Sequence, residues 1–290
     1  MKILVTGASG LLGMQLVNKL RQDHNIIALL KNNPSNQIEE SKTLRVLKCD
    51  LSSLETQDLP KDIDFIYYLA QSNQYKDFPG GANDMFNLNI SSPFKLINWA
   101  INNKVKGFVF ASSGGVYKTP NEPVKEVFQI NANIPNGFYL DSKLSSEILL
   151  RNFSSFFDTF IIARPFFIYG KNQKKTMLIP RLIDSVKNKK EIFFSKNGGI
   201  KINPINVLDA AYAFEKMLDL KGEHIINIAG DEVVSLKKLV KQIGKLCSIK
   251  PEFKTLDHIQ NDLVADNQKM KELLYVPNIK LSEGLKVMID

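Results

Sequence analysis

The sequence predicts an α/β fold in which a doubly wound parallel sheet carries a smaller, interleaved C-terminal subdomain. Short, almost wholly apolar runs alternate with amphipathic segments over the first half of the chain, and the first of these runs leads directly into a glycine-rich turn. After Gly170 the alternation becomes looser. Continuous apolar runs are typical of strands buried on both faces, and strand–helix alternation is typical of a parallel sheet.

Six apolar runs are the expected strands: Lys2–Thr6, Asn25–Leu30, Leu44–Cys49, Asp64–Ala70, Gly107–Ser112 and Thr159–Arg164. Three segments between them have helical spacing of apolar residues: Leu11–Arg21, Asn83–Asn102 and Asn136–Phe153. Sheets of this kind bind ligands beyond the carboxyl ends of their strands, so we expect a site at that edge.

The second half predicts a mixture of elements. We expect helices at Ile179–Lys189, Leu208–Leu218 and Ser235–Cys247, the last capped by Ser235, and strands at Lys201–Val207 and His224–Ala229. Residues 267–290 predict two helices around a turn at Pro277. Residues 1–170, with 201–229 returning to them, therefore form the main domain, and residues 171–200 and 230–290 form the subdomain.

Composition excludes several classes of protein. The 290 residues are 44% apolar, carry a formal charge of +8 and include two cysteines. Neither a signal peptide nor an apolar run of about 20 residues is present, so we expect a cytoplasmic protein with no membrane association. The basic residues are spread out, which indicates a solvated surface or an anionic small ligand rather than nucleic acid. No metal site is expected, because ligand-type spacing is missing at Cys49, Cys247, His24, His224 and His258.

A glycine turn joins the first expected strand to the first helix. Gly7 suits the tight turn, Gly10 lets the backbone approach a pyrophosphate, and Gly13 lets the helix pack closely on the strand. A structural turn without a ligand is the alternative. The context predicts a dinucleotide-binding Rossmann domain, with the pyrophosphate at Gly7, Ser9, Gly10, Leu11, Leu12 and Gly13.

Residues at the ends of the next strands are candidates to bind the other parts of the cofactor. NAD-binding proteins usually carry an acid at the tip of the second strand, where this chain has Lys31. A lysine attracts a 2′-phosphate, so we prefer NADP to NAD; Lys31 is otherwise a solvated loop residue. Asp50 is a candidate acceptor for the adenine amino group, with Leu51 against the ring, or else Asp50 is a turn residue. The fourth strand ends at Leu69, Ala70 and Gln71, where small residues such as Ala70 would let the cofactor lie close.

A pair four residues apart is the candidate chemical centre. Tyr139 and Lys143 share one face of an expected helix. A nearby ammonium lowers the pKa of a tyrosine, which would make Tyr139 an acid and base usable near neutral pH. The lysine is also a candidate to hold the nicotinamide ribose. Ser113 ends the fifth strand and is placed to polarise a substrate oxygen, although a strand-end cap is the alternative.

Together these features resemble the extended short-chain dehydrogenase/reductase family, in its NAD-dependent epimerase/dehydratase group. The resemblance covers nearly the whole chain, including Arg164–Gly170, Ile205–Ala211 and Ala265–Lys269. It implies that Ser113, Tyr139 and Lys143 are catalytic, that Asn89 helps to place the cofactor and that the loop at Phe166 packs near the nicotinamide. It also implies hydride transfer at a sugar carbon, most often C4 of a nucleotide-linked sugar, and a homodimer through the helices Asn83–Asn102 and Asn136–Phe153.

Three departures narrow this expectation. Sugar-nucleotide 4,6-dehydratases of the family carry an acidic pair after the catalytic hydroxyl, where this chain has Gly114-Gly115, so we do not expect dehydration. Phe167 and Ile202 replace an asparagine and an arginine that usually grip the substrate. Candidate substitute cations are Lys174, Lys175, Arg181 and Lys201.

Our leading hypothesis is a reductase or C4 epimerase of a nucleotide-linked sugar. One alternative keeps the chemistry but reduces a small non-nucleotide carbonyl compound in an apolar pocket at Phe166 and Phe167. The other is a sensor that binds a dinucleotide without turnover.

Overall fold

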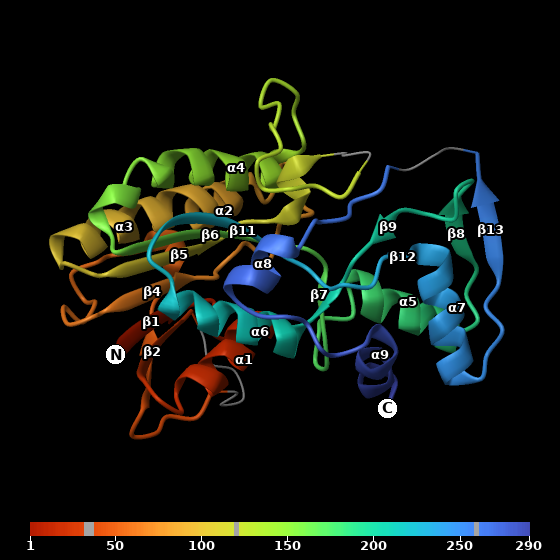
Figure 1. Cartoon of the computed structure of the whole chain (residues 1–290), viewed down its shortest axis with the longest axis horizontal. Coiled ribbons are helices and arrows are strands. Elements are labelled where there is room, and N and C mark those ends of the chain that lie inside the picture. Colours follow the sequence, from red (N-terminus) through yellow and green to blue (C-terminus); the bar gives the residue numbers. More distant parts are fainter. Residues whose placement is uncertain (32–37, 119–121, 258–260) are drawn as a thin grey trace.

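The central sheet confirms the doubly wound α/β prediction. The computed structural model describes residues 1–31, 38–118, 122–257 and 261–290, so His258 lies outside the described residues (Figure 1). Seven parallel strands follow the order β11-β6-β5-β4-β1-β2-β3. The chain winds outward in both directions from β1, which pairs with β2 and β4 and so places the topological switch point beside the glycine turn. The strands are β1 (Lys2–Thr6), β2 (Asn25–Leu30), β3 (Leu44–Lys48), β4 (Phe65–Tyr68), β5 (Gly107–Ala111), β6 (Thr159–Pro165) and β11 (Gly222–Ile228).

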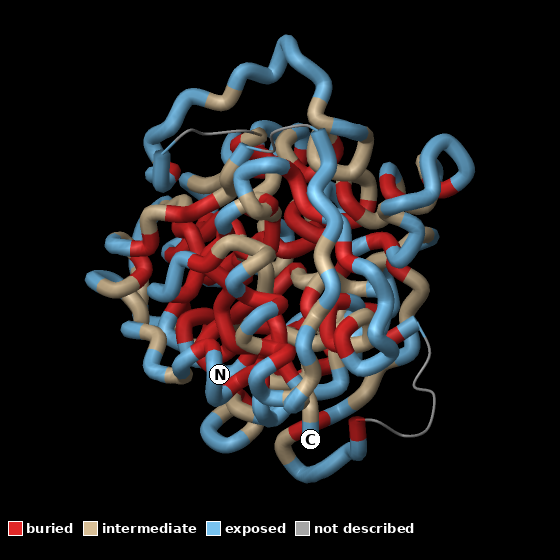
Figure 2. The backbone as a smooth tube through the Cα atoms, turned by 90° about the vertical axis from the view of Figure 1, so that its right-hand side faces the viewer, coloured by how far each residue is buried: buried red, intermediate tan, exposed pale blue. Residues whose placement is uncertain are grey.

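Helices cover both faces of this sheet (Figure 1). One face packs against α1 (Leu11–Leu20) and α6 (Val207–Lys216), with Leu16 and Phe214 wholly buried against strand residues such as Val5. The other packs against α3 (Ser92–Asn102) and α4 (Phe138–Arg151) through side chains that include Ile97 and Leu150. Figure 2 shows the buried backbone gathered at the centre of the molecule, between exposed outer segments.

The helix predicted over Asn83–Asn102 is interrupted. It consists of α2 (Ala82–Phe86), a π-helical turn (Asn87–Ser91) and α3. The wide turn brings Asn89 fully into the interior, where its Nδ2 donates to Ser142 Oγ of α4 at 2.9 Å. Single π-turns inside helices often occur at functional sites, and this one braces the helix that carries Tyr139 and Lys143.

The strand predicted over Lys201–Val207 was wrong as one element. Asn203 and Pro204 separate β9 (Lys201–Ile202) from β10 (Ile205–Asn206), since a proline cannot donate to a ladder. β9 pairs antiparallel with β12 (Val234–Ser235), whereas β10 pairs in parallel with β7 (Ile168–Tyr169). From Ile205 of β10 onward, through α6 and β11, the 201–229 segment packs into the core of the main sheet.

A second core lies at the right of Figure 1. It combines α5 (Leu178–Lys187), α7 (Leu236–Cys247) and α9 (Leu281–Ile289) with a parallel pair that the sequence did not predict, β8 (Ile192–Ser195) and β13 (Phe253–Leu256). The predicted cap is confirmed, because Ser235 accepts from the backbone N–H of Lys238 at 3.3 Å. By contrast, α8 (Gln268–Leu273) sends Met270 into the core under the main sheet, so residues 230–290 serve both parts.

No helix among the described residues is long and apolar enough to cross a membrane. Cys49 and Cys247, both described, are free thiols.

Candidate active site

The glycine turn has the geometry that a cofactor pyrophosphate requires. Gly7 adopts φ +66°, and a Cβ there would lie 2.8 Å from the backbone nitrogen of Ala70. A Cβ on Gly13 would lie 2.2 Å from the carbonyl oxygen of Gly7, so only glycine lets α1 start this close to the strand. Gly10 is the N-cap of α1 and provides no side-chain cap. The residues present therefore fit a phosphate group, because the uncapped helix N-terminus offers N–H donors and the positive end of the helix dipole.

The end of β4 lies directly beside this turn. Thr6 Oγ1 accepts from the N–H groups of Leu69 at 3.1 Å and Ala70 at 3.2 Å, which ties the ends of β1 and β4 together. Ala70 is buried, while Gln71 is exposed and begins the loop that follows. Three of the predicted cofactor-binding positions are thus gathered at the carboxyl edge of the sheet.

Lys31 and Asp50 form an ion pair that the sequence did not reveal. Lys31 Nζ lies 2.8 Å from Asp50 Oδ2, and Asp50 Oδ1 also accepts from the N–H and hydroxyl of Ser52. These hydrogen bonds hold the pKa of Asp50 below its usual range and raise the pKa of Lys31. Asp50 therefore neutralises the cation on which the preference for NADP rested. Leu51, next in the chain, packs most of its side chain into the core under α3.

Tyr139 lies at the start of α4 and faces the loop after β4. Its hydroxyl donates to Gln71 Oε1 at 2.8 Å, and its ring packs against Tyr75 with centroids 5.4 Å apart. Lys143, one turn later, is 1% exposed; its Nζ donates to the carbonyl oxygen of Ala111 at 2.9 Å and lies 4.9 Å from the centre of the Phe110 ring. The predicted pair thus points from one helix face toward the ends of β4 and β5.

The predicted electrostatic coupling within this pair was wrong for the structure. The pKa of Tyr139 is raised above its usual value, first by burial and then by Tyr75. Burial also lowers the pKa of Lys143 to about 7. Since the lysine gives its hydrogen bond to Ala111 and is itself destabilised as a cation, it does not lower the tyrosine pKa here.

Ser113 caps a short helix, and its hydroxyl can also donate a hydrogen bond. Its Oγ accepts from the N–H of Gly115 at 3.2 Å and caps the short 3₁₀ helix Gly114–Tyr117, as the alternative interpretation expected. A hydroxyl that accepts in this way keeps its proton for donation to another oxygen. The Phe166 ring, 1% exposed, covers Gly114, and a Cβ on Gly114 would lie 2.5 Å from its edge.

Phe167 occupies the position where the resemblance leads one to expect asparagine. It adopts φ +45°, a left-handed conformation that bulky residues rarely take and that asparagine tolerates better. Its half-buried ring contacts both the second core and the small cluster around Tyr117. The ring therefore places an apolar surface where the two parts of the chain meet.

Two loops approach each other beside Tyr139. Tyr75 Oη donates to Met177 Sδ at 3.3 Å, Lys76 Nζ donates to the carbonyl of Thr176 at 3.2 Å, and Lys174 Nζ donates to Asn73 Oδ1 at 2.6 Å. Among the proposed substitute cations, Lys201 is paired with Asp262 at 3.3 Å, whereas Lys174 stands at the junction of the two loops.

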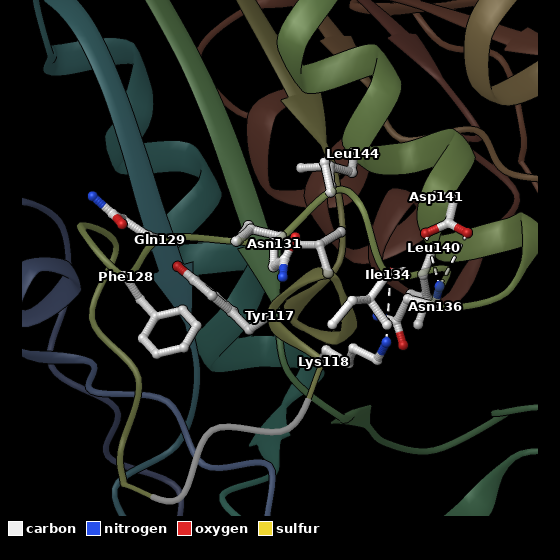
Figure 3. A pocket seen from close by; sticks show the side chains of 13 residues that line it. Tyr117, Lys118, Phe128, Gln129, Asn131, Ile134, Asn136, Leu140, Asp141 and Leu144 are labelled. Atoms are coloured by element: carbon white, nitrogen blue, oxygen red, sulfur yellow. Dashed lines mark hydrogen bonds between the residues drawn. The ribbon is translucent and has the colours of Figure 1, made fainter.

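A cavity of about 160 Å³ lies on the neighbouring face of α4 (Figure 3). Leu140, Asp141 and Leu144 of the helix form one wall, and Tyr117 and the loop through Phe128 and Ile134 form the rest. Asn136 donates its backbone N–H to Asp141 and its side chain to the carbonyl of Gly115, so the residue predicted to start the helix instead precedes it and lines this cavity.

Comparison with known proteins settles the family. The sequence model of the NAD dependent epimerase/dehydratase family matches residues 3–229, which include the glycine turn, Ser113, Tyr139 and Lys143. The chain belongs to this family.

Relatives in the epimerase/dehydratase family extend over the full chain. An uncharacterized UDP-glucose epimerase of Bacillus subtilis is 28% identical over 98% of this chain and 96% of its own length. A putative UDP-glucose 4-epimerase of Methanocaldococcus jannaschii is 27% identical, covering 99% and 97%. The solved structure of a UDP-glucuronic acid 4-epimerase from Bacillus cereus in complex with NAD is 25% identical, with a TM-score of 0.88 and coverage of 100% and 97%.

Two buried residues beside the candidate site were not among the site residues predicted from the sequence. Glu147 lies four residues after Lys143 on α4, and Arg164 ends β6; both are almost fully buried. A carboxylate at helical spacing after Lys143 and an arginine in an otherwise apolar strand were the available signals.

Proposed function

We propose that this protein interconverts the C4 epimers of a nucleotide-linked sugar with NAD as its cofactor. One observation carries the proposal: α4 directs Tyr139 and Lys143 to the sheet edge where the glycine turn and Ser113 also lie. The named activities of the relatives support the choice of a UDP-linked hexose. The alternative of a sensor that binds a dinucleotide without turnover is disfavoured, because Ser113, Tyr139 and Lys143 are all present in the chain.

Each candidate residue has a definite task in this reaction. Tyr139 takes the proton of the sugar 4-hydroxyl as C4 is oxidised, and returns it when the keto carbon is reduced. Ser113 donates a hydrogen bond to that oxygen, and Lys143 holds the cofactor ribose beside it. NAD, when bound, supplies the acceptor and then the donor of hydride. If the keto sugar rotates in the site between the two steps, C4 receives hydride on its opposite face, which gives the C4 epimer.

NAD replaces NADP as the proposed cofactor. Asp50 places a carboxylate 2.8 Å from Lys31, and that carboxylate would oppose a 2′-phosphate. The Bacillus cereus relative was solved with NAD, which agrees with this choice. The cytoplasm stays the proposed location, since the two cysteines are free thiols.

We also propose that the protein is not a 4,6-dehydratase. Relatives include a mouse dTDP-D-glucose 4,6-dehydratase at 22% identity, so the family alone does not decide the reaction. The Phe166 ring fills the space that a side chain at position 114 would need, and neither Gly114 nor Gly115 offers an acid or a base for removing water.

A homodimer is the proposed assembly. Exposed apolar side chains gather on the helices that cover one face of the sheet and on the turn after α4: Phe86, Phe94, Ile148, Leu149 and Phe156. Apolar surface of this kind on adjacent helices is typical of a protein interface.

The test is direct conversion of purified substrate. Incubation with UDP-glucose, UDP-glucuronic acid and UDP-N-acetylglucosamine, followed by proton NMR, should show the C4 epimer of at least one of them without net reduction of cofactor. A protein that leaves every nucleotide sugar unchanged, but consumes NADPH with a small carbonyl compound, would support the alternative reductase instead.

A further inference from the structure

The helix face that carries Tyr139 and Lys143 continues to a buried carboxylate. Residues four apart share a helix face, so Glu147 follows Tyr139 and Lys143 in line on α4. Glu147 is 2% exposed and Arg164, at the end of β6, is 4% exposed. Arg164 Nε donates to the two Glu147 carboxylate oxygens at 3.0 and 3.2 Å, and Nη2 donates to Oε2 as well. This pair joins the helix to the sheet through a fork that fixes distance and orientation together.

Arg164 is in turn held by its neighbours. Its guanidinium carbon lies 4.6 Å from the centre of the Tyr117 ring, and Tyr117 Oη donates to Asn227 Oδ1 at 2.8 Å. Asn227 is the β11 partner of Arg164 in the sheet, and its Nδ2 donates to the carbonyl of Val124 at 2.9 Å. The network therefore links α4, β6, β11 and the 3₁₀ helix that Ser113 caps.

This network reaches the residues that are the candidates for catalysis. Only Pro165 separates Arg164 from Phe166, whose ring covers Gly114 beside Ser113. Lys143, one turn before Glu147, donates to Ala111 at the end of β5. A shift of α4 against β6 would therefore move Tyr139 and Lys143 relative to Ser113.

We propose that Glu147 and Arg164 are positioning residues, whose ion pair sets the place of Tyr139 and Lys143 against the ends of β5 and β6. The proposal rests on the proposed function, because it concerns the residues assigned to hydride transfer. Buried ion pairs add little net stability over apolar side chains of similar volume. What this pair adds is fixed geometry, and a displacement of about 1 Å at a site can reduce its rate by about 100-fold.

Glu147 also acts on the charge of Lys143. Its carboxylate raises the pKa of Lys143 against the larger effect of burial, which brings that pKa to about 7. Other ionisable groups on the surrounding elements already have partners or neighbours of their own: Tyr139 with Gln71, Tyr68 with Leu88, Asp84 with Ser72, Lys95 with Leu54 and Tyr117 with Asn227. Removing the Glu147 charge should therefore lower the Lys143 pKa further.

The experiment separates positioning from stability. Glu147→Gln leaves Arg164 buried without a counter-charge, whereas the double variant Glu147→Met/Arg164→Met removes both charges of the pair and should keep its Tm within a few degrees of wild type. We expect the double variant to lose about 10- to 100-fold in kcat for nucleotide-sugar epimerisation, with little change in KM. The matched control is Glu223→Gln, which breaks the exposed pair that joins Arg151 of α4 to β11 at 2.7 Å and should leave kcat unchanged. A double variant that keeps both Tm and kcat overturns the proposal.

A second measurement does not depend on turnover. The Lys143 side chain, labelled with ¹³C and assigned by its loss in Lys143→Arg, is titrated by NMR without substrate. Its midpoint should fall in Glu147→Gln and in the double variant, and stay in place in Glu223→Gln. If wild type converts no nucleotide sugar but the midpoint still falls, the proposed function fails and the positioning pair stands. An unmoved midpoint in both variants contradicts the positioning role whatever the activity.

Discussion

Tyr139 donates its hydroxyl to Gln71, while Lys143 on the same helix face donates to the carbonyl of Ala111. Burial acts on both in the direction of the neutral form: it raises the pKa of the tyrosine and lowers that of the lysine to about 7. At the scale of single residues the sequence identified both groups through their four-residue spacing. Their protonation state could not be read in the same way, because it depends on burial and on neighbours such as Tyr75 and Glu147, which lie elsewhere in the chain or the helix.

Replacing Tyr139 by phenylalanine tests its assignment as acid and base. The change removes one oxygen and keeps the ring that packs against Tyr75. We expect kcat to fall by about 100- to 10,000-fold, the usual contribution of a positioned acid or base, while NAD affinity stays close to wild type. Steady-state turnover and calorimetric NAD binding measure the two effects, and wild-type turnover in this variant would remove Tyr139 from the mechanism.

The pH dependence of stability reports on Lys143. Its pKa is about 7 in the folded protein, whereas an unfolded lysine titrates near 10.4. Between these values the unfolded chain binds the additional proton, so this group makes the free energy of unfolding rise with pH by about 1.4 kcal/mol per unit. Denaturant unfolding of Lys143→Met between pH 7.5 and 9.5 should show a slope shallower by this one proton. Lys190→Met, at an exposed ion pair, is the control and should keep the wild-type slope; equal slopes in all three proteins contradict the expected shift.

At the scale of elements, the first half of the chain was the more predictable. Each strand of the main sheet begins and ends within two residues of its predicted bounds, because strands buried on both faces leave a continuous apolar run. The π-turn around Asn89 and the break at Asn203-Pro204 were not predicted, since both depend on tertiary contacts. β8 and β13 were missed because Phe193 and Leu256 are exposed and the two short strands find each other only in the folded chain.

Gly114 tests how tightly the elements at the site are packed. A methyl group there would lie 2.5 Å from the Phe166 ring, so Gly114→Ala should lower the free energy of unfolding by about 1–3 kcal/mol. Denaturant titration measures this change. Gly114→Ala combined with Phe166→Leu replaces the ring by a smaller side chain and should recover much of the loss. If Gly114→Ala is as stable as wild type, the ring does not close this position, and the structural argument against a dehydratase loses its support.

For the whole molecule, the doubly wound sheet and the family were evident from the sequence; the seven-stranded order confirms the fold, and the match to the family model confirms the family. The domain division remains approximate, because α8 packs under the main sheet although it follows the second core in the chain. Sequence spacing gave no sign of the contacts among Asn73, Lys76, Lys174 and Thr176, which join two loops about a hundred residues apart. Such contacts exist only once both parts are folded together.

The proposed dimer is also a property of the whole molecule. Ile148→Lys/Leu149→Lys places two charges among the exposed apolar residues of α4. We expect wild type to have twice the mass of one chain by light scattering, and this variant to have the mass of one chain with its fold intact by circular dichroism. Val287→Lys, at an exposed apolar residue of α9, is the control and should remain dimeric. A monomeric wild type contradicts the proposal directly.

The most direct test of an NAD-dependent epimerase is to denature the purified protein and identify by mass spectrometry the nicotinamide cofactor that it releases. An epimerase must hold its cofactor through both hydride transfers, so we expect close to one NAD per chain. NADP in the released fraction, or an empty protein that binds NADPH reversibly, would contradict this account and indicate a reductase.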